Sequence, residues 1–415
     1  NLYRFGQDVN LGIAWRWTEE AVSEAALPWE FLQYSADPAL TGDELAAYLD
    51  GVNQETTQCW ALIEPLPRDK YSLEIRTRDL VSQMLSAKIH HAVAAFVPEP
   101  FSNECGLMND DGTPGELLLP WRTTAALLGG TEYLGQIEMK GGSENRIFRR
   151  DDGTIVMVVW NDQPTRELIY LGENVQCISI WGREMKLEID AHRQIIDAGP
   201  MPNFLIGLSE PVARWRMAVQ LQYDRIPSVF AVAHPNTLSI QNPFPQGAGG
   251  YAKIVSGDEW TIEPRQIDFK IAMGEQQNLP FHITLPFSAS SGDQQIRIDY
   301  HFSVDRAYHF SVYRNIVVGL GDIMLEVSTH FDQGGSLVVE QRMTNRTDKY
   351  VDFRCFLRTK KRRHQRSHVF RLGRGQDIQQ YRFHDGQELL GEEFQIRAEE
   401  IGGTRVLIHR FLVEE

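Results

Sequence analysis

The sequence of 415 residues has few cysteines, no long apolar run and too few basic residues to balance its acidic ones. Its four cysteines (Cys59, Cys105, Cys177, Cys355) stand far apart with no CxxC pair, which excludes thiolate metal motifs and leaves buried thiols or one or two disulfides open. No apolar stretch reaches about 18 residues, which excludes a membrane-spanning helix. A formal net charge of -15 argues against nucleic acid as the main partner, because phosphate binding needs a cationic surface.

Signals for processing and for metal binding are also scarce. The first residues lack an initiator Met, a basic segment and an apolar signal core, so we expect the natural chain to be processed or to extend before Asn1. His90 and His91 adjoin one another, but the spacing offers no third ligand, and we expect no metal and no cofactor. What remains is ordinary globular composition, 42% hydrophobic and 23% charged, with room for about two to four domains.

Residues 1–130 alternate short apolar runs with helical stretches. Stretch 73–91 places Leu80, Val81, Met84, Leu85 and Ile89 at helical spacing, which predicts an amphipathic helix with one apolar face. Strand–helix alternation predicts a parallel sheet. We count four strand–helix units in residues 1–130. They fill about half of the ~250 residues that a complete (β/α)8 barrel needs, which predicts half of a barrel. The expected strands are 9–17, 29–36, 57–66 and 92–101, and the expected helices are 41–54, 73–91 and 115–129.

The pattern changes at about residue 131, where strands and turns follow one another to the C-terminus. "NRIFRRDDGTIVMVVWND" predicts a hairpin around its "DDG" turn, and later segments have turn signals at the spacing of β-sandwiches. The predicted fold is therefore multidomain, α/β plus all-β, with the C-terminal half of a (β/α)8 barrel followed by two or three β-sandwich domains. The predicted domains are 1–130 (partial barrel), 131–208 (small β-sandwich), 209–305 (immunoglobulin-like β-sandwich) and 306–415 (C-terminal β-sandwich).

Three stretches resemble the clan A glycoside hydrolases of bacterial surface or secreted type. "AAFVPEPFSNECGLMNDDGTPGELLLPWRTTAALLGG" resembles the end of their barrels, where an eighth strand leads through a loop into a helix. "FRRDDGTIVMVVWND" is similar to the β-sandwich that caps such barrels, and "DEWTIEP" with "MGEQQNLPFHITLP" to their immunoglobulin-like modules. The resemblance covers most of the chain but rests on loose patterns rather than on a diagnostic motif. It implies an extracellular or cell-surface protein.

The resemblance implies a nucleophile at Glu64, because the family carries its nucleophilic Glu where the seventh barrel strand ends. Retaining hydrolysis needs a second carboxylate, which the family places after an Asn at the end of the fourth strand. The Asn-Glu pair here is Asn103-Glu104, which lies downstream of Glu64, so the chain departs from the family pattern. Either the first half of the barrel lies in sequence not included here, or the site is inactive. A structural role for Glu64, as a capping or ion-paired loop carboxylate, also stays open.

Two other residues near strand ends are candidate sugar contacts. Trp17 shares a strand face with Trp15 and stands nearer the strand's C-terminal end, where its ring could stack on a sugar. Packing in the core is the alternative for both. Glu99, between Pro98 and Pro100, could bind a sugar hydroxyl, and the alternative is a rigid turn.

A cationic stretch at 354–375 contrasts with the acidic chain and predicts a local positive field, for which a solvated hairpin is the alternative. Two functions follow from these patterns. The first is a glycoside-hydrolase-like protein that acts on or binds polysaccharide, using Glu64 if it is active. The second is an inactive surface scaffold or carbohydrate-binding subunit that self-associates, giving a homo-oligomer or surface assembly. The candidate partner-binding residues are Arg358, Lys360, Lys361, Arg362, Arg363 and Arg366.

Overall fold

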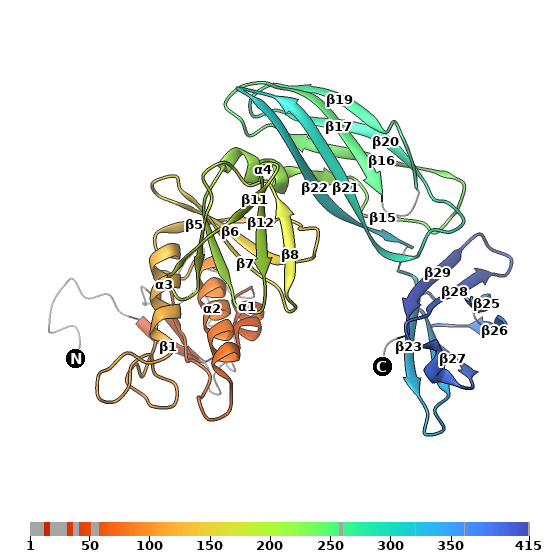
Figure 1. Ribbon diagram of the computed structural model, residues 1–415, viewed down its shortest axis with the longest axis horizontal. Coiled ribbons are helices and arrows are strands. Elements are labelled where there is room, and N and C mark those ends of the chain that lie inside the picture. The colour runs from red at the N-terminus through yellow and green to blue at the C-terminus, as the bar shows by residue number, and fades with distance from the viewer. Residues whose placement is uncertain are drawn as a thin grey trace. The chain divides into compact units, whose positions relative to one another are not determined.

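The chain divides into two compact units, Asn1–Met217 (unit 1) and Ala218–Glu415 (unit 2). Strand accounts for 49% of the chain and helix for 13%, so the protein is mainly β (Figure 1). The four predicted domains divide the chain more finely and stay a prediction. The computed structural model describes residues 12–16, 31–35, 41–50, 58–256, 260–319, 321–360 and 362–413.

Unit 1 begins with a sheet of four parallel strands in the order β1-β2-β3-β4. Helix α1 (Gly42–Asp50) lies between β2 and β3 in the chain, α2 (Leu73–Ile89) lies between β3 and β4, and α3 (Leu118–Leu128) follows β4. The strands are short: β1 (Gly12–Arg16), β2 (Phe31–Ser35), β3 (Gln58–Leu62) and β4 (Ala94–Phe96).

The prediction of half a (β/α) barrel was wrong. The described residues form an open four-stranded parallel sheet with few helices, and antiparallel sheets make up most of the fold. The physical reason is that strand–helix alternation specifies parallel pairing of neighbouring strands but carries no information on whether the sheet curves and closes. The fold class is therefore mainly β, and the described residues contain no half barrel.

Helix α2 is buried on two sides rather than on the single face predicted. Leu80 and Met84 pack into one apolar cluster with Ile63, the residue after β3. Val81 and Leu85 pack into a second cluster, which covers one face of the next sheet. Residues four apart lie one above the other on a helix, so each pair forms a separate stripe. The helix therefore joins the parallel sheet to the sheet that follows.

That following sheet is six-stranded and antiparallel, and both of its faces are covered. Strand β7 (Ile155–Trp160) is buried along five consecutive residues: Ile155, Met157 and Val159 belong to one cluster, whereas Val156 and Val158 belong to the cluster with α2. Burial on both faces explains why "IVMVV" has no polar alternation. The sheet has the order β10-β9-β13-β7-β6-β5.

The remaining strands of unit 1 flank this sheet. A small sheet has the order β11-β12-β8, and helix α4 (Glu210–Ala218) ends the unit. The strands are β5 (Thr131–Gly135), β6 (Glu144–Arg150), β8 (Thr165–Ile169), β9 (Gln176–Ser179), β10 (Glu184–Met185), β11 (Glu188–Asp190), β12 (Arg193–Ala198) and β13 (Asn203–Leu208).

Unit 2 contains long antiparallel strands with alternating burial. Its first pair of sheets has the orders β14-β16-β20-β18 and β15-β22-β21-β17-β19. Strands β21 (Gly292–Ser303) and β22 (Ala307–Val318) each span 12 residues, and every second side chain over most of their length is buried. The others are β14 (Gln220–Leu221), β15 (Arg225–Ile226), β16 (Ala233–Gln241), β17 (Ala248–Ser256), β18 (Thr261–Glu263), β19 (Gln266–Ile271) and β20 (Gln276–Thr284).

The C-terminal part of unit 2 is a sandwich of two sheets, β23-β24-β27 and β26-β25-β28-β29. Met343 of β24 (Leu337–Asn345) packs into one cluster with Phe353 and Cys355 of β25 (Val351–Thr359), so the sheets share a core. The other strands are β23 (Ile323–Phe331), β26 (Gln365–Leu372), β27 (Gly375–Phe383), β28 (Glu393–Glu400) and β29 (Val406–Leu412).

Candidate functional site

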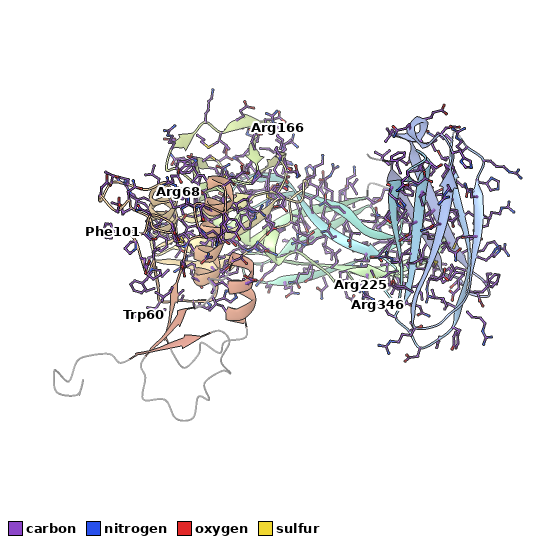
Figure 2. The ribbon with its side chains drawn as sticks, turned by 90° about the horizontal axis from the view of Figure 1, so that it is seen from below. Trp60, Arg68, Phe101, Arg166, Arg225 and Arg346 are labelled. Carbon is purple, nitrogen blue, oxygen red and sulfur yellow. The ribbon has the colours of Figure 1, made fainter. Side chains whose placement is uncertain are left out.

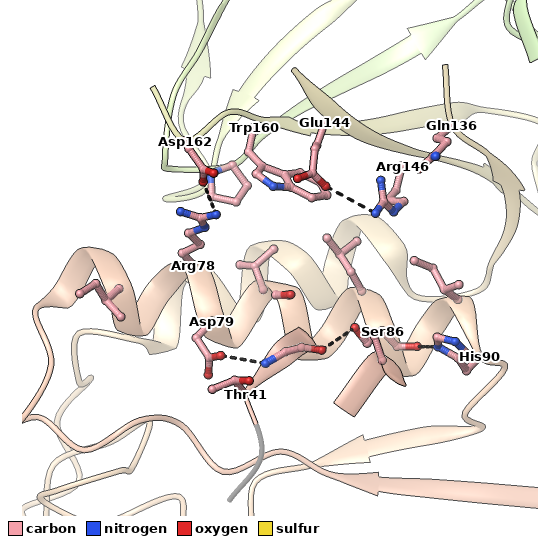
Figure 3. Close-up of a pocket in the computed structure, with 18 of the residues that line it drawn as sticks. Thr41, Arg78, Asp79, Ser86, His90, Gln136, Glu144, Arg146, Trp160 and Asp162 are labelled. Carbon is pink, nitrogen blue, oxygen red and sulfur yellow. Dashed lines mark hydrogen bonds and ion pairs between the residues drawn. The ribbon is translucent and has the colours of Figure 1, made fainter. Parts of the chain in front are cut away.

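A pocket of about 850 Å³ lies within unit 1, between α2 and strands of the six-stranded sheet (Figure 3). Its size falls in the range of small-molecule sites, about 300–1,000 Å³. We call it the α2 pocket. It is lined by Thr41, Gly42, Ala46, Leu66, Tyr71, Ile75, Arg78, Asp79, Val81, Ser82, Leu85, Ser86, Ile89, His90, Tyr133, Gly135, Gln136, Glu144, Arg146, Trp160, Asp162 and Pro202.

One wall is α2, which is capped and braced by polar side chains. Ser72 precedes the helix, and its Oγ accepts a hydrogen bond from the backbone N–H of Ile75 at 3.3 Å, which satisfies one open donor of the first turn. Asp79 Oδ1 accepts from Gly42 N–H at 2.9 Å, and Ser86 Oγ donates to the Gly42 carbonyl at 3.2 Å. The first turn of α1 is thereby fixed against α2.

Gly42 is required at that contact because the two helices approach closely there. A Cβ atom on this residue would lie 2.2 Å from Ser82 Oγ, well inside van der Waals contact. The missing side chain allows the two helices to share hydrogen bonds at the edge of the pocket.

The opposite wall comes from β6 and from the end of β7. Side chains alternate along β6, so Asn145 and Ile147 lie buried on the face of the sheet away from α2. Glu144 and Arg146 lie on the opposite face, towards the pocket. The Nη2 of Arg146 lies 3.6 Å from Glu144 Oε2, and its Cζ lies 5.3 Å from the centroid of the Trp160 ring. Trp160 pairs directly with Glu144 across the two strands, so the three side chains form one ordered group.

An ion pair closes one end of the pocket. Arg78 of α2 donates to Asp162, which follows β7, and thereby links the two walls (Figure 3). Both side chains keep contact with solvent, with 41% of the Arg78 side chain and 71% of the Asp162 side chain exposed. The contact is therefore weak enough to rearrange when a ligand enters.

The lining combines charges of both signs with aromatic rings. Two guanidinium groups face three carboxylates, those of Asp79, Glu144 and Asp162, so no sign of charge dominates. Trp160, Tyr133 and Tyr71 add aromatic surface, and burial raises the pKa of Tyr133, which keeps its phenol neutral. Such a lining suits a neutral ligand that both donates and accepts hydrogen bonds and has an apolar face.

The predicted nucleophile lies elsewhere, at the carboxyl edge of the parallel sheet. Glu64 is two residues beyond β3 and Glu99 is three residues beyond β4, and both are exposed. The pairing of Leu62 with Phe96 brings these two strand ends side by side. The Nε2 of Gln83 donates to the Glu64 carbonyl at 3.4 Å, which ties this turn to α2. Neither carboxylate lines the α2 pocket.

A cluster of charged side chains near this edge was not predicted from the sequence. Arg76 of α2 is 3% exposed; its Nε donates to the Leu66 carbonyl at 2.9 Å, and its Nη1 donates to Glu116 Oε2 at 3.0 Å. Arg68 Nη2 binds the other oxygen of Glu116 at 2.9 Å, and Arg68 is labelled in Figure 2. The hydrogen bond from Arg68, followed by the charges of both arginines, lowers the pKa of Glu116. The sequence did offer a signal for this cluster, because Arg76 stands four residues before Leu80, in line with the apolar side chains of α2.

A thiol lies close to the predicted nucleophile. Burial raises the pKa of Cys105, and the charges of Glu64 and Glu104 raise it further. Trp17, the other predicted sugar contact, lies outside the described residues.

The basic segment, residues 354–375, includes most of β25, all of β26 and the first residue of β27. Arg358 and Arg366 place their Cζ atoms 5.8 Å and 5.6 Å from the ring centroid of Phe356. Arg362 pairs with Glu388 at 2.9 Å, so part of the positive charge is compensated. Lys360 and Arg363 are exposed, and Lys361 lies outside the described residues.

No group of three or more His, Cys, Asp or Glu side chains in the described ranges could hold a metal ion. None of the described helices combines the length and the apolarity needed to cross a membrane.

Comparison with known proteins gives slight structural likenesses. No family model and no curated sequence matches the chain. A family 39 glycoside hydrolase from the gut symbiont Bacteroides cellulosilyticus WH2 is similar over 41% of this chain, with 14% identity and a TM-score of 0.32. The match spans 38% of the hydrolase, so well under two thirds of that enzyme corresponds to this chain.

Two solved chaperone structures are similar to a comparable share of the chain. The YadV chaperone matches over 47% of this chain and 100% of its own, with 12% identity and a TM-score of 0.20. The E. coli chaperone DraB matches over 48% and 98%, with 13% identity and the same TM-score. Likenesses with such low TM-scores do not establish a shared overall fold and carry no functional argument.

Proposed function

We propose that the chain is a carbohydrate-binding protein whose α2 pocket takes a neutral saccharide without hydrolysing it. The observation that carries the proposal is the composition of the pocket, in which donors, acceptors and aromatic rings surround one space of about 850 Å³. Sugar hydroxyls both donate and accept hydrogen bonds, and the C–H face of a sugar ring packs on aromatic rings. A balanced set of guanidinium and carboxylate groups satisfies such hydroxyls without selecting a charged ligand.

The test is calorimetric titration of the full chain with a panel of neutral oligosaccharides. Trp160→Ala removes the central ring, and we expect it to weaken binding about tenfold or more, which is about 1.4 kcal/mol or more. Tyr350→Ala is the matched control, because Tyr350 is an exposed ring in unit 2 with Arg371 Cζ 5.6 Å from its centroid. Equal affinities in both variants, or no binding by the wild type, would remove the pocket as the site.

Hydrolysis at Glu64 is the second candidate, and one observation favours it. Glu64 and Glu99 follow adjacent parallel strands and are both exposed, so two carboxylates stand at one sheet edge. Retaining hydrolysis uses two carboxyl groups about 5–5.5 Å apart, one to attack the anomeric carbon and one to protonate the leaving oxygen. In this candidate Glu64 attacks, and Glu99, predicted as a sugar contact, assists it from the end of the adjacent strand.

A turnover assay separates the two candidates. Aryl glycosides are incubated with the wild type, with Glu64→Gln and with Glu99→Gln. The binding proposal expects no turnover above background in any of the three proteins. Turnover in the wild type that disappears in Glu64→Gln would establish hydrolysis and overturn the non-catalytic proposal.

An extracellular or cell-surface location and self-association belong to the same proposal. The basic segment supports self-association by charge complementarity, because Arg358 and Arg366 are exposed on a chain of net charge -15. Sedimentation at low and high salt tests self-association by comparing the wild type with a double variant that carries Arg358→Glu and Arg366→Glu. We expect the wild type to associate at low salt and the double variant to stay monomeric, and identical sedimentation would count against it.

A further inference from the structure

Two histidines face each other on the outer side of a long sheet in unit 2. His301 of β21 and His309 of β22 are directly opposite in the antiparallel register, and a hydrogen bond of 2.6 Å joins their Nδ1 atoms, which a bound ion would replace. Their neighbours Phe302 and Phe310 are buried, so strand alternation turns both imidazoles outwards. His309 is exposed and His301 is half-buried. A chelating ion could therefore reach both nitrogens from solvent.

Neighbouring strands fix the orientation of this pair. Tyr251 of β17 lies beside His301 in the register, and the two rings stack with centroids 4.9 Å apart and planes at 17°. The His301 and His309 rings meet edge to face, with centroids 4.7 Å apart. The His301 ring, which contacts Tyr251 on one side and His309 on the other, has little rotational freedom. This restriction lowers the entropy cost of chelation.

Charged neighbours on the same face leave the pair available. Asp299 Oδ1 accepts a hydrogen bond from Ser311 Oγ at 2.6 Å and pairs with Arg297 Nε at 2.9 Å, so this oxygen is engaged.

We propose that His301 and His309 form a two-ligand site for a divalent transition-metal ion, bound through their two Nδ1 atoms. Metal–imidazole bonds of about 2.0–2.1 Å place two nitrogens about 2.8–3.0 Å apart at a right angle and about 3.3–3.4 Å apart at a tetrahedral angle. The observed 2.6 Å is nearer the first value, so a square-planar ion requires less movement of the rings. Copper(II) combines that geometry with the highest affinity among the divalent first-row ions.

The site lies in unit 2 and is independent of the saccharide proposal. The described residues offer no third protein ligand among His, Cys, Asp and Glu, so water would complete the coordination. Magnesium and calcium are not expected to bind, because they take oxygen ligands.

The experiment is titration of the untagged full chain with copper(II), followed by calorimetry and by electron paramagnetic resonance at one equivalent. Variants are His301→Gln and His309→Gln, with His282→Gln as the matched control, because His282 is exposed on β20. We expect both site variants to bind about tenfold or more weakly than the wild type, because one ligand of a chelating pair is lost. The control should bind like the wild type.

Two outcomes would overturn the inference. One is an unchanged affinity in His309→Gln, and the other is an equal loss in His282→Gln, which would indicate scattered single-histidine binding. The spectrum of the wild type gives a test that does not depend on the folding of any variant. It should carry the splitting pattern of two equivalent imidazole nitrogens, and a pattern from one nitrogen would contradict the site.

Discussion

The two units cover their sheets in different ways, and the difference decides where a ligand can be held. In unit 1, β7 is buried along five consecutive residues because α2 and α3 cover one face and other strands, with α4, cover the opposite face. In unit 2, β21 and β22 bury every second side chain over most of their length and present the rest to solvent. A pocket arises where α2 meets the edge of a covered sheet, whereas unit 2 offers its side chains on open faces. Unit 1 therefore offers an enclosed pocket, and these strands of unit 2 offer an open face.

The largest expected effect tests whether the units are energetically separate. Phe148 in unit 1 and Phe394 in unit 2 are both 0% exposed. Each truncation to Ala should cost about 3–5 kcal/mol through lost burial and a residual cavity. Denaturant unfolding, followed by hydrogen exchange resolved along the chain, should show each variant destabilising its own unit. A loss of the same size in both units would contradict the division at Met217.

Buried charge should matter more in unit 1 than in unit 2. Arg76→Met removes a guanidinium that is 3% exposed and leaves the Leu66 carbonyl without its donor, which we expect to cost about 3 kcal/mol. Arg405→Met removes a pair with Asp322 at 2.7 Å whose side chains are each 26% exposed, with an expected cost of about 1 kcal/mol or less. Urea denaturation of both variants checks the ranking, and a reversed order would refute it.

A smaller effect concerns acid stability in unit 1. The folded pKa of Glu116 is lowered, so its ion pairs contribute stability above the unfolded value of about 4.3, and this contribution is lost as pH falls through the folded pKa. Glu116→Gln should therefore lower the free energy of unfolding near neutral pH and flatten its fall below about pH 4.3. Parallel curves for the two proteins across that range would show that the carboxylate contributes nothing.

The smallest effect tests the position of Glu64. Its charge contributes to the raised pKa of Cys105, after burial, so Glu64→Gln should lower that pKa and speed alkylation of Cys105 at fixed pH. The gain should stay below about tenfold, which would correspond to one pKa unit. Glu99→Gln is the control, because Glu99 does not contribute to that pKa shift. Peptide mapping follows Cys105 against Cys177, whose pKa burial raises to about 11.

Parts of the fold followed from local sequence signals. The spacing of Leu80, Val81, Met84 and Leu85 predicted a helix at 73–91, and the helix spans Leu73–Ile89. The "DDG" turn predicted the β6–β7 hairpin, which pairs Glu144 with Trp160. These features depend on residues close together in the chain, where spacing and turn chemistry dominate.

Other parts depend on contacts between distant residues. Parallel pairing from β1 to β4 followed from strand–helix alternation, but closure into a barrel depends on curvature, which no local pattern encodes. Arg78 and Asp162 are 84 residues apart in the sequence, and their meeting across the α2 pocket follows from tertiary packing. The same holds for His301 and His309, whose register is set by the sheet. The pocket could therefore not be assembled from spacing alone.

The most direct test is hydrogen exchange of the full chain with and without a saturating neutral oligosaccharide that it binds. Binding in the α2 pocket predicts slower exchange in α2, β6 and the end of β7. Exchange should stay unchanged in the strands of unit 2 and in residues 98–116, the segment after β4 that carries Glu99 of the alternative site. Protection confined to residues 98–116, or to unit 2, would place the ligand elsewhere and contradict the account.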